Sequence, residues 1–384
     1  MTVYVVTTIV TILLAALNEH YINSRRKHKY LCRILNILIV FIPAFIAGVR
    51  DYTIGVDVYT YAYPLFIRAQ SMNSFLGFMK SSTVEPGYKI LVYLTSVFFD
   101  DAHWLLFFTS LLTGLLFYIS VYLVKDRCSI TVAQIIYLLM FYPESLNIMR
   151  QYLAVGIALL GFVLLLKGKA KTSLLLTVVT VFFHRSAVLA LAFYAIHILY
   201  REGNSTKPRR TKKSKLPPQF ITFVLTVVIF AVVLLFTRVM AFVYSLGLFP
   251  DSYSVYTASN NSGSYFKPTI FYIMPYVFYY TRSKKVWPKN TMKIISIFDI
   301  ALSLLRWQVF YLNRVAIYYC AVRILSLSQI KFDLSAIIRT KKIKKSDICC
   351  LGIIVGTIIY YIFNTVFWNN GYIWPYKSQI IGIK

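Results

Sequence analysis

Residues 103–124 read HWLLFFTSLLTGLLFYISVYLV and contain no Asp, Glu, Lys or Arg. An α-helix rises about 1.5 Å per residue, so roughly twenty such residues match the hydrocarbon core of a bilayer. Inside lipid each backbone N–H and C=O must find a partner within the protein, and a helix pairs them within the segment itself. This stretch therefore predicts a transmembrane helix.

Stretches of the same kind recur along the chain, which has 384 residues, of which 58% are hydrophobic. Too few polar residues remain to cover a soluble domain, and no alternation with a period of two suggests a β-barrel. We therefore expect an all-α, polytopic transmembrane helical bundle. Polar breaks divide it into about twelve candidate spans, at 2–17, 32–49, 103–124, 130–147, 152–166, 172–183, 187–200, 220–246, 268–281, 291–305, 308–328 and 348–367.

Segment 86–99 is apolar but too short for a full span, so it predicts an interfacial or re-entrant helix. The whole chain, 1–384, is expected to form a single integral membrane domain. Within it, an N-terminal bundle (1–200) precedes a basic loop (201–219) and a C-terminal bundle (220–384).

The net charge of +28 is unevenly distributed, and this distribution predicts the topology. If 86–99 does not span, 28 of the 41 Lys and Arg residues lie in loops on one side. The positive-inside rule makes that side the cytoplasm and places both termini outside. Counting 86–99 as a span would instead move the loop 125–127 to the other side. The charge therefore indicates a membrane protein of defined orientation, with no nucleic-acid partner expected.

Two outer segments carry carboxylates beside a glycine. Arg50 and Asp57 bracket Gly55, so a tight turn could bring the two charges together, although an ordinary surface loop fits as well. Glu85 precedes Pro86 at the start of the short apolar helix. An N-capping carboxylate is the simpler interpretation of Glu85.

Two further segments carry cationic or titratable groups. Asn147, Arg150 and Gln151 share a helical face at the outer end of a span, where an arginine could also extend to lipid headgroups. His184 lies between two apolar segments too short to cross fully, so it should sit below the outer surface. The alternative is that His184 is an ordinary core residue whose ring nitrogens are paired by hydrogen bonds.

The C-terminal region offers weaker candidates, namely Arg314, Tyr376 and Lys377, among aromatic residues also typical of a membrane interface. Taken together, the outer groups predict a cavity with arginines, carboxylates and one histidine. Arginine binds phosphate oxygens in pairs, and histidine or a carboxylate can accept a hydroxyl proton. Such a cavity suits a diphosphate lipid and a sugar hydroxyl.

The motif order identifies a resemblance. Gly55-x-Asp-x-Tyr59, Glu85-Pro-Gly-Tyr88, Asn147-x-x-Arg-Gln-x-x-Ala154 and Phe183-His-x-Ser-Ala187 resemble the EpsG family of bacterial exopolysaccharide membrane proteins, within the wider Wzy-type class of polysaccharide polymerases. The resemblance covers residues 45–200 and continues weakly at 313–314 and 375–377. Residues 216–300 match nothing in the family pattern.

The resemblance implies a GT-C-like fold and a metal-independent glycosyl transfer that needs no cofactor. The reaction would take place at the outer face of the bacterial cytoplasmic membrane. Its donor would be a chain linked to undecaprenyl diphosphate, and its acceptor a hydroxyl of a lipid-linked repeat unit. The product would be exopolysaccharide, capsule or O-antigen.

Residue roles follow from that implied reaction. Arg150, with Arg50 and Arg314, would stabilise the leaving diphosphate. His184 would act as the base, with Asp57 or Glu85 as competitors for that role. The remaining candidates for substrate binding are Asn147, Gln151, Tyr376 and Lys377.

Two other function classes stay open on these residues. A flippase or transporter of lipid-linked sugars would also need a cationic cavity, but such proteins usually show pseudo-symmetric halves, and no repeat is visible. A related polysaccharide ligase is the other alternative. Beyond the lipid-linked substrates, the candidate partners are membrane lipids and a chain-length regulator.

Overall fold

The computed structural model describes residues 2–24, 28–72, 74–200, 217–235, 287–305, 313–330 and 345–383, with residues 238, 241, 242, 245 and 246 between them. Over these residues the chain is helical, and its only β-type pairing is an isolated bridge between Ser378 and Ile383. The predicted all-α class is therefore confirmed.

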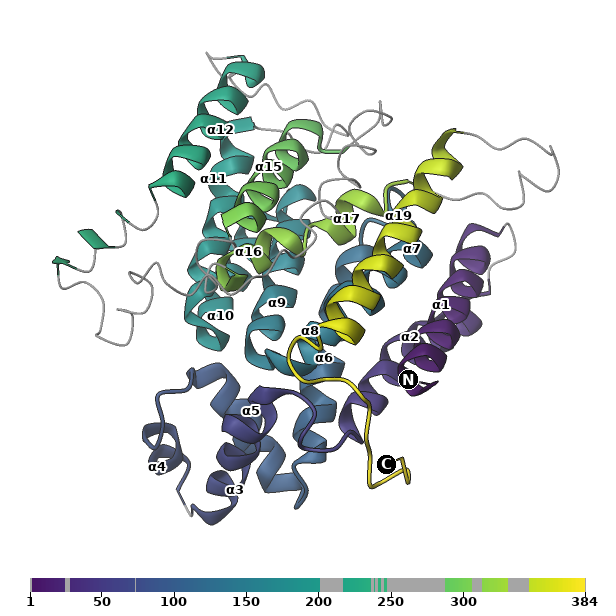
Figure 1. Cartoon of the computed structure of the whole chain (residues 1–384), viewed down its shortest axis with the longest axis vertical. Helices are drawn as coiled ribbons and strands as arrows, with labels where there is room; N and C mark the ends of the chain where they lie inside the picture. Colours follow the sequence, from purple (N-terminus) through teal and green to yellow (C-terminus); the bar gives the residue numbers. More distant parts are fainter. Residues whose placement is uncertain are drawn as a thin grey trace.

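Among the described residues, five helices are long and apolar enough to cross a membrane. The first four are α1 (Thr2–Asn23), α2 (Lys29–Gly48), α6 (His103–Tyr122) and α9 (Met149–Leu166). The fifth is α19 (Lys345–Tyr361), which continues directly into the π-helix η6 (Ile362–Phe367). All five are labelled in Figure 1. The chain is a membrane protein.

The other described spans form shorter pieces, so a count of about twelve is not established. Segment 130–147 divides into α7 (Ile130–Ile136), the π-helix η2 (Tyr137–Phe141) and α8 (Tyr142–Asn147). The remaining pieces are α10 (Ala170–Phe183), the 3₁₀ helix η3 (Arg185–Ala190), α11 (Leu191–Tyr200), α12 (Pro218–Leu234), α15 (Lys289–Leu305), α16 (Asn313–Cys320) and α17 (Arg323–Leu327). The predicted span 268–281 lies outside the described residues. The GT-C-like likeness stays a prediction.

Helix α9 is the most enclosed of the long helices, with 89% of its apolar window buried in the protein. It packs against α6, α10, α11 and α16. A helix hydrophobic all round belongs in the centre of a bundle, since every face meets another helix. This placement holds the first turn of α9, with Arg150 and Gln151, among several neighbouring elements.

One end of the bundle carries a layer of short helices (Figure 1). It consists of η1 (Val58–Ala62), α3 (Tyr63–Ser71), α4 (Phe75–Lys80) and α5 (Pro86–Phe98). The predicted short helix 86–99 forms as α5 and packs against α3, α4, α6 and α10. The helices η1, α3 and α4 were not predicted.

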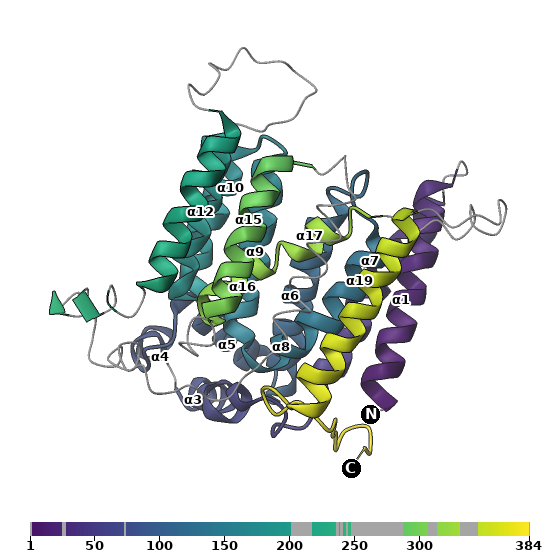
Figure 2. The ribbon, with the colours of Figure 1, turned by 45° about the horizontal axis from the view of Figure 1, so that its top comes forward.

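Both chain termini lie at this same end (Figures 1 and 2). The hydroxyl of Tyr4 donates to the carbonyl of Ile373 at 3.1 Å, and the N–H of Asp51 donates to the carbonyl of Lys377 at 2.9 Å. At the opposite end, Lys167 Nζ donates to the carbonyl of Leu123 at 2.8 Å. The described basic turns near 123–129 and 167–171 therefore lie away from the termini, as the charge pattern predicts.

Candidate functional site

Arg150 lies in the first turn of α9, directly after a break in the helix at Ile148. Its Nη1 lies 2.5 Å from Oε2 of Glu85, and the two side chains are only 21% and 9% exposed. Its guanidinium carbon stands 4.2 Å from the ring centroid of Tyr61, a cation–π distance. The arginine is therefore held by an ion pair and by an aromatic face.

The Nε of Arg150 is buried and has no hydrogen-bond partner among the described residues. Leaving a buried donor unpaired costs about 1–3 kcal/mol, so such a group needs an explanation. The guanidinium pairs with Glu85 through Nη1 alone and has a further donor, Nε, that no described residue satisfies. The chemistry of this donor set fits an anion such as phosphate.

Glu85 occupies the N-cap position of α5, yet its side chain makes no capping hydrogen bond. Instead its Oε2 faces Arg150 and its Oε1 accepts a long, 3.4 Å bond from the backbone N–H of Arg185. Gly87 allows this approach, because a Cβ there would stand 2.8 Å from the carbonyl oxygen of Phe182. The capping interpretation of Glu85 is thus replaced by an ion pair between elements.

Asp57 joins the site through Tyr61. The Tyr61 hydroxyl donates to Asp57 Oδ2 at 2.7 Å, and the Asp57 N–H donates to Asn147 Oδ1 at 3.3 Å. Partial burial raises the pKa of Asp57, although the Tyr61 hydrogen bond and the Arg150 and Arg314 cations oppose the shift. Asp57 therefore lies beside Arg150 without bonding it directly.

His184 sits between α10 and η3, half-buried, with its Nδ1 2.7 Å from Ser186 Oγ. Burial lowers the pKa of His184 to about 4; the nearby Glu85 carboxylate raises it, whereas the Arg150 and Arg314 cations lower it further. The imidazole is consequently neutral at physiological pH. The charged groups that affect its pKa are Glu85, Arg150 and Arg314, all of them predicted site residues. His184 therefore has polar surroundings and does not lie in a sealed apolar core.

A polar network connects His184 to α9 and α16. Ser186 Oγ receives a long, 3.4 Å bond from Gln151 Nε2 and lies 3.3 Å from the hydroxyl of Tyr318. Gln151 also donates to the backbone carbonyl of Arg314 at 2.5 Å. The side chain of Arg314 is exposed at the start of α16. The network thus includes a segment more than 100 residues distant in sequence.

Three predicted substrate-binding residues have other surroundings. Arg50 is 1% exposed, and its guanidinium donates to the carbonyls of Ile54, Ala47 and Leu146, so it forms no ion pair with Asp57. Tyr376 is 2% exposed and donates to the carbonyl of Ile46 at 2.9 Å. Lys377 holds the first outer loop through its backbone. These residues brace the end of the bundle, and we leave them out of the proposed site.

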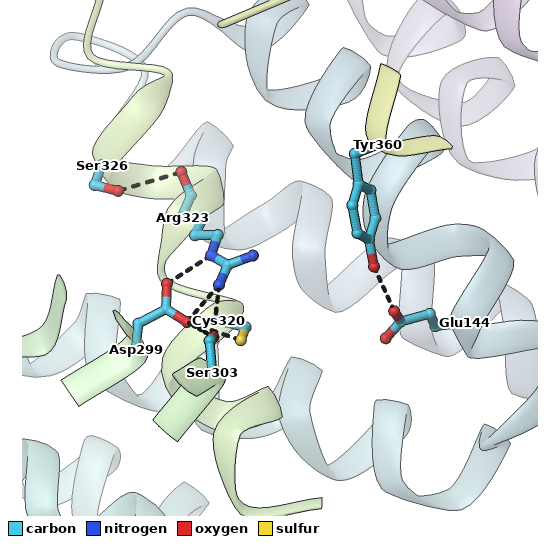
Figure 3. Close-up of polar contacts among 7 residues, drawn as sticks. All are labelled: Glu144, Asp299, Ser303, Cys320, Arg323, Ser326 and Tyr360. Carbon is cyan, nitrogen blue, oxygen red and sulfur yellow. Dashed lines mark hydrogen bonds and ion pairs between the residues drawn. The ribbon is translucent and has the colours of Figure 1, made fainter. Parts of the chain in front are cut away.

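Sequence reasoning missed two sets of polar residues, and Figure 3 shows the Asp299–Arg323 pair of the first and the Glu144–Tyr360 contact of the second. Asp299 and Arg323 form a buried ion pair, with Nε and Nη2 each 2.5 Å from a carboxylate oxygen. Glu144 accepts a hydrogen bond from Tyr152 and another from Tyr360, both at 2.7 Å. Each charge interrupts an otherwise apolar segment, which was the signal available in the sequence.

In the part of the chain that the structure describes, no three His, Cys, Asp or Glu side chains gather as metal ligands would. That the reaction needs neither metal nor cofactor stays a prediction.

The model of the EpsG family matches residues 33–378, nearly the whole chain. The chain belongs to the EpsG family. The match includes both α9 and α16, so it extends beyond the 45–200 covered by the sequence resemblance. No curated protein and no solved structure matches the chain. EpsG membership indicates a membrane protein related to exopolysaccharide.

Proposed function

We propose that this EpsG-family chain is a Wzy-type polysaccharide polymerase. It would join oligosaccharide repeat units carried on undecaprenyl diphosphate at the outer face of the bacterial cytoplasmic membrane. The observation that carries the proposal is Arg150, a partly buried arginine that is paired with Glu85, has no partner for its Nε among the described residues, and lowers the pKa of His184 by its charge. A cation with a free donor beside a neutral imidazole suits a leaving diphosphate and an acceptor hydroxyl.

Bond making and breaking balance without an added reactant. The acceptor hydroxyl oxygen attacks the anomeric carbon of the donor sugar, and the bond from that carbon to the diphosphate oxygen breaks. The diphosphate leaves with the electron pair of that bond, and its growing charge is stabilised by Arg150. The hydroxyl proton passes to His184. The exposed Arg314 lies close enough to lower the pKa of both His184 and Asp57. Its positive charge would add to that of Arg150 in stabilising the leaving diphosphate.

The hydrogen bonds of Ser186 define which imidazole nitrogen accepts that proton. The amide of Gln151 can only donate to Ser186 Oγ. If Ser186 then donates its own proton to Tyr318, it accepts the Nδ1–H of His184, and Nε2 remains free as the base. If Tyr318 donates instead, Ser186 must donate to Nδ1, and Nε2 becomes a hydrogen-bond donor. The proposed base role requires the first arrangement.

The test uses the full chain purified into vesicles with a lipid-diphosphate-linked repeat unit. We expect a ladder of polymer lengths together with release of free lipid diphosphate, one per bond formed. Movement of intact lipid across the bilayer with no new bond would indicate a transporter. A single transfer to a different acceptor, without a ladder, would indicate a ligase. Either result would contradict the proposal.

A further inference from the structure

We infer that Glu85 is a specificity residue that occupies Arg150 in the free protein and is displaced only by a highly charged ligand. The inference rests on the proposed function, because it concerns the same arginine. It adds a reason why the site would choose a lipid diphosphate over other anionic lipids that surround the protein.

The contact between Glu85 and Arg150 is the kind that a ligand can replace. It uses a single guanidinium nitrogen, Nη1, while Nε stays unpaired. The other oxygen of Glu85 has only the 3.4 Å contact with the Arg185 N–H. Two parallel bonds from a guanidinium to a phosphate are stronger than one bond to a carboxylate. A phosphate that pairs with both terminal nitrogens must take Nη1 from Glu85, and it gains a second parallel bond that Glu85 does not make.

Glu85 has another favourable place once it is displaced. It stands at the N-cap of α5, where its side chain makes no capping bond in the present arrangement. The first N–H groups of a helix lack partners within the helix, and this end attracts negative charge. A rotation of the Glu85 side chain to that end would leave its charge stabilised after Arg150 has turned to the ligand.

Charge explains the selectivity. The ion pair is neutral as a unit and is largely shielded from solvent, with side chains 21% and 9% exposed. A phospholipid headgroup with one negative charge would replace the Glu85 carboxylate by another monoanion and would gain little binding free energy. A diphosphate brings more charge and more oxygens, so it gains enough to displace the carboxylate. Removing the Glu85 charge should therefore tighten anion binding and weaken discrimination.

Glu144 supplies a matched control. It is another glutamate, half-buried on α8, and it accepts hydrogen bonds from the hydroxyls of Tyr152 and Tyr360 at 2.7 Å. Glu144→Gln removes the same charge from the bundle, and the groups that bond Glu144 are tyrosine hydroxyls instead of an arginine. A general electrostatic effect would appear in both variants, whereas the specific effect belongs to Glu85→Gln.

The experiment measures the Kd of inorganic pyrophosphate for the full chain in nanodiscs of zwitterionic lipid. We expect Glu85→Gln to bind at least about tenfold more tightly than wild type, a change of about 1.4 kcal/mol. Glu144→Gln should remain within about twofold of wild type, on the scale of ordinary surface changes. Replacing part of the lipid by phosphatidylglycerol should weaken pyrophosphate binding to Glu85→Gln and leave wild type nearly unchanged.

Equal affinities of wild type and Glu85→Gln, or an equal gain in Glu144→Gln, would overturn the inference. If Glu85→Gln does not fold, Glu85→Asp keeps the charge, withdraws it from Arg150, and should also bind more tightly. Pyrophosphate binding that Arg150→Ala leaves intact would contradict the proposed function itself. The inference about Glu85 and the proposed function are therefore contradicted by different results.

Discussion

His184 shows how neighbouring residues modify a catalytic candidate. A histidine in water titrates near neutral pH, but here burial and two arginines lower its pKa to about 4. A base works in its unprotonated form, so a lowered pKa extends activity toward acid. Such a base gives up some proton affinity but stays available over the whole physiological range.

The first prediction concerns that titration. The rate of glycosyl transfer should stay constant from neutral pH down to about one unit above the lowered pKa. It should then fall as His184 becomes protonated near pH 4. Arg314→Met removes a cation that lowers the pKa, so its acid limb should move to higher pH. The measurement is the initial rate of polymer formation against pH. A wild-type limb near the ordinary histidine value would contradict the assigned environment.

At this scale the sequence pointed to candidate residues, but it did not predict their contacts. Arg150, Glu85 and His184 were found because each is a charged or titratable group in an apolar setting. Arg50 shares that signal, yet its guanidinium is used by three backbone carbonyls. The sequence does not show which backbone carbonyls will lack hydrogen-bond donors. An arginine that pairs with such carbonyls therefore cannot be told from a ligand-binding arginine by sequence alone.

At the scale of elements, the approach of α5 to the end of α10 places Glu85 near His184. Gly87 makes that approach possible, because a Cβ would meet the backbone oxygen of Phe182 at 2.8 Å. Overpacking of this kind costs about 1–3 kcal/mol, and a misplacement of about 1 Å can reduce a rate about 10²-fold.

The second prediction is that Gly87→Ala lowers the transfer rate by about 10- to 10²-fold while the protein still inserts. Gly356→Ala in α19 is the control, since a Cβ there would meet nothing within 4 Å. That control should keep its activity and its thermal stability in detergent. Equal, near-normal rates for both variants would show that the α5–α10 contact does not position the site.

The third prediction concerns the ion pair between α15 and α17. Asp299 and Arg323 are 0% and 2% exposed, and Cys320 and Ser303 also contact the carboxylate. Removing one partner of a buried pair usually costs about 3–5 kcal/mol, whereas replacing both by apolar residues often costs little. We expect Asp299→Leu to lower the melting temperature strongly and the double variant with Arg323→Met to recover most of it. A double variant less stable than the single one would contradict this account.

Helices were predicted well where apolar runs were long, and less well where polar and aromatic residues mixed. The segment 130–147 was predicted as one helix, but it contains a π-helical turn and ends in a break at Ile148, which places Arg150 at a helix start. Helix α3 begins at Tyr63, followed by Pro64, and tyrosine and proline have weak helix propensity. Packing against α5 supports α3 and α4, and packing is not visible in local sequence.

At the scale of the whole molecule, the two ends of the bundle differ in their charge and in the segments that they contain. The short helices α3, α4 and α5 and both termini share one end (Figure 2), whereas the described basic turns near 123–129 and 167–171 lie at the other. The number of spans could not be obtained from hydropathy alone, because short apolar helices such as α10 and α16 can be partial spans or packed inside the bundle.

The fourth prediction tests orientation in intact cells with a variant lacking the native cysteines. Thr83→Cys, exposed just before Glu85, should react with an impermeant maleimide added outside. Asp126→Cys, at a side chain 72% exposed in a basic turn, should react only after the cells are opened. The loop 201–215, predicted to be cytoplasmic, lies outside the described residues and should behave like Asp126→Cys. The reverse pattern would place the site in the cytoplasm.

The central claim is that Arg150 and His184 act together, the arginine on the diphosphate and the histidine on the hydroxyl. The most direct measurement is the rate of polymer ladder formation by His184→Ala and Arg150→Lys, with binding of lipid-linked repeat and membrane insertion measured in parallel. We expect His184→Ala to lose about 10²–10⁴-fold in rate while it still binds substrate. Arg150→Lys keeps the charge but loses the fork, and should lose about 10²–10³-fold. Near-normal ladders from either variant would contradict the account.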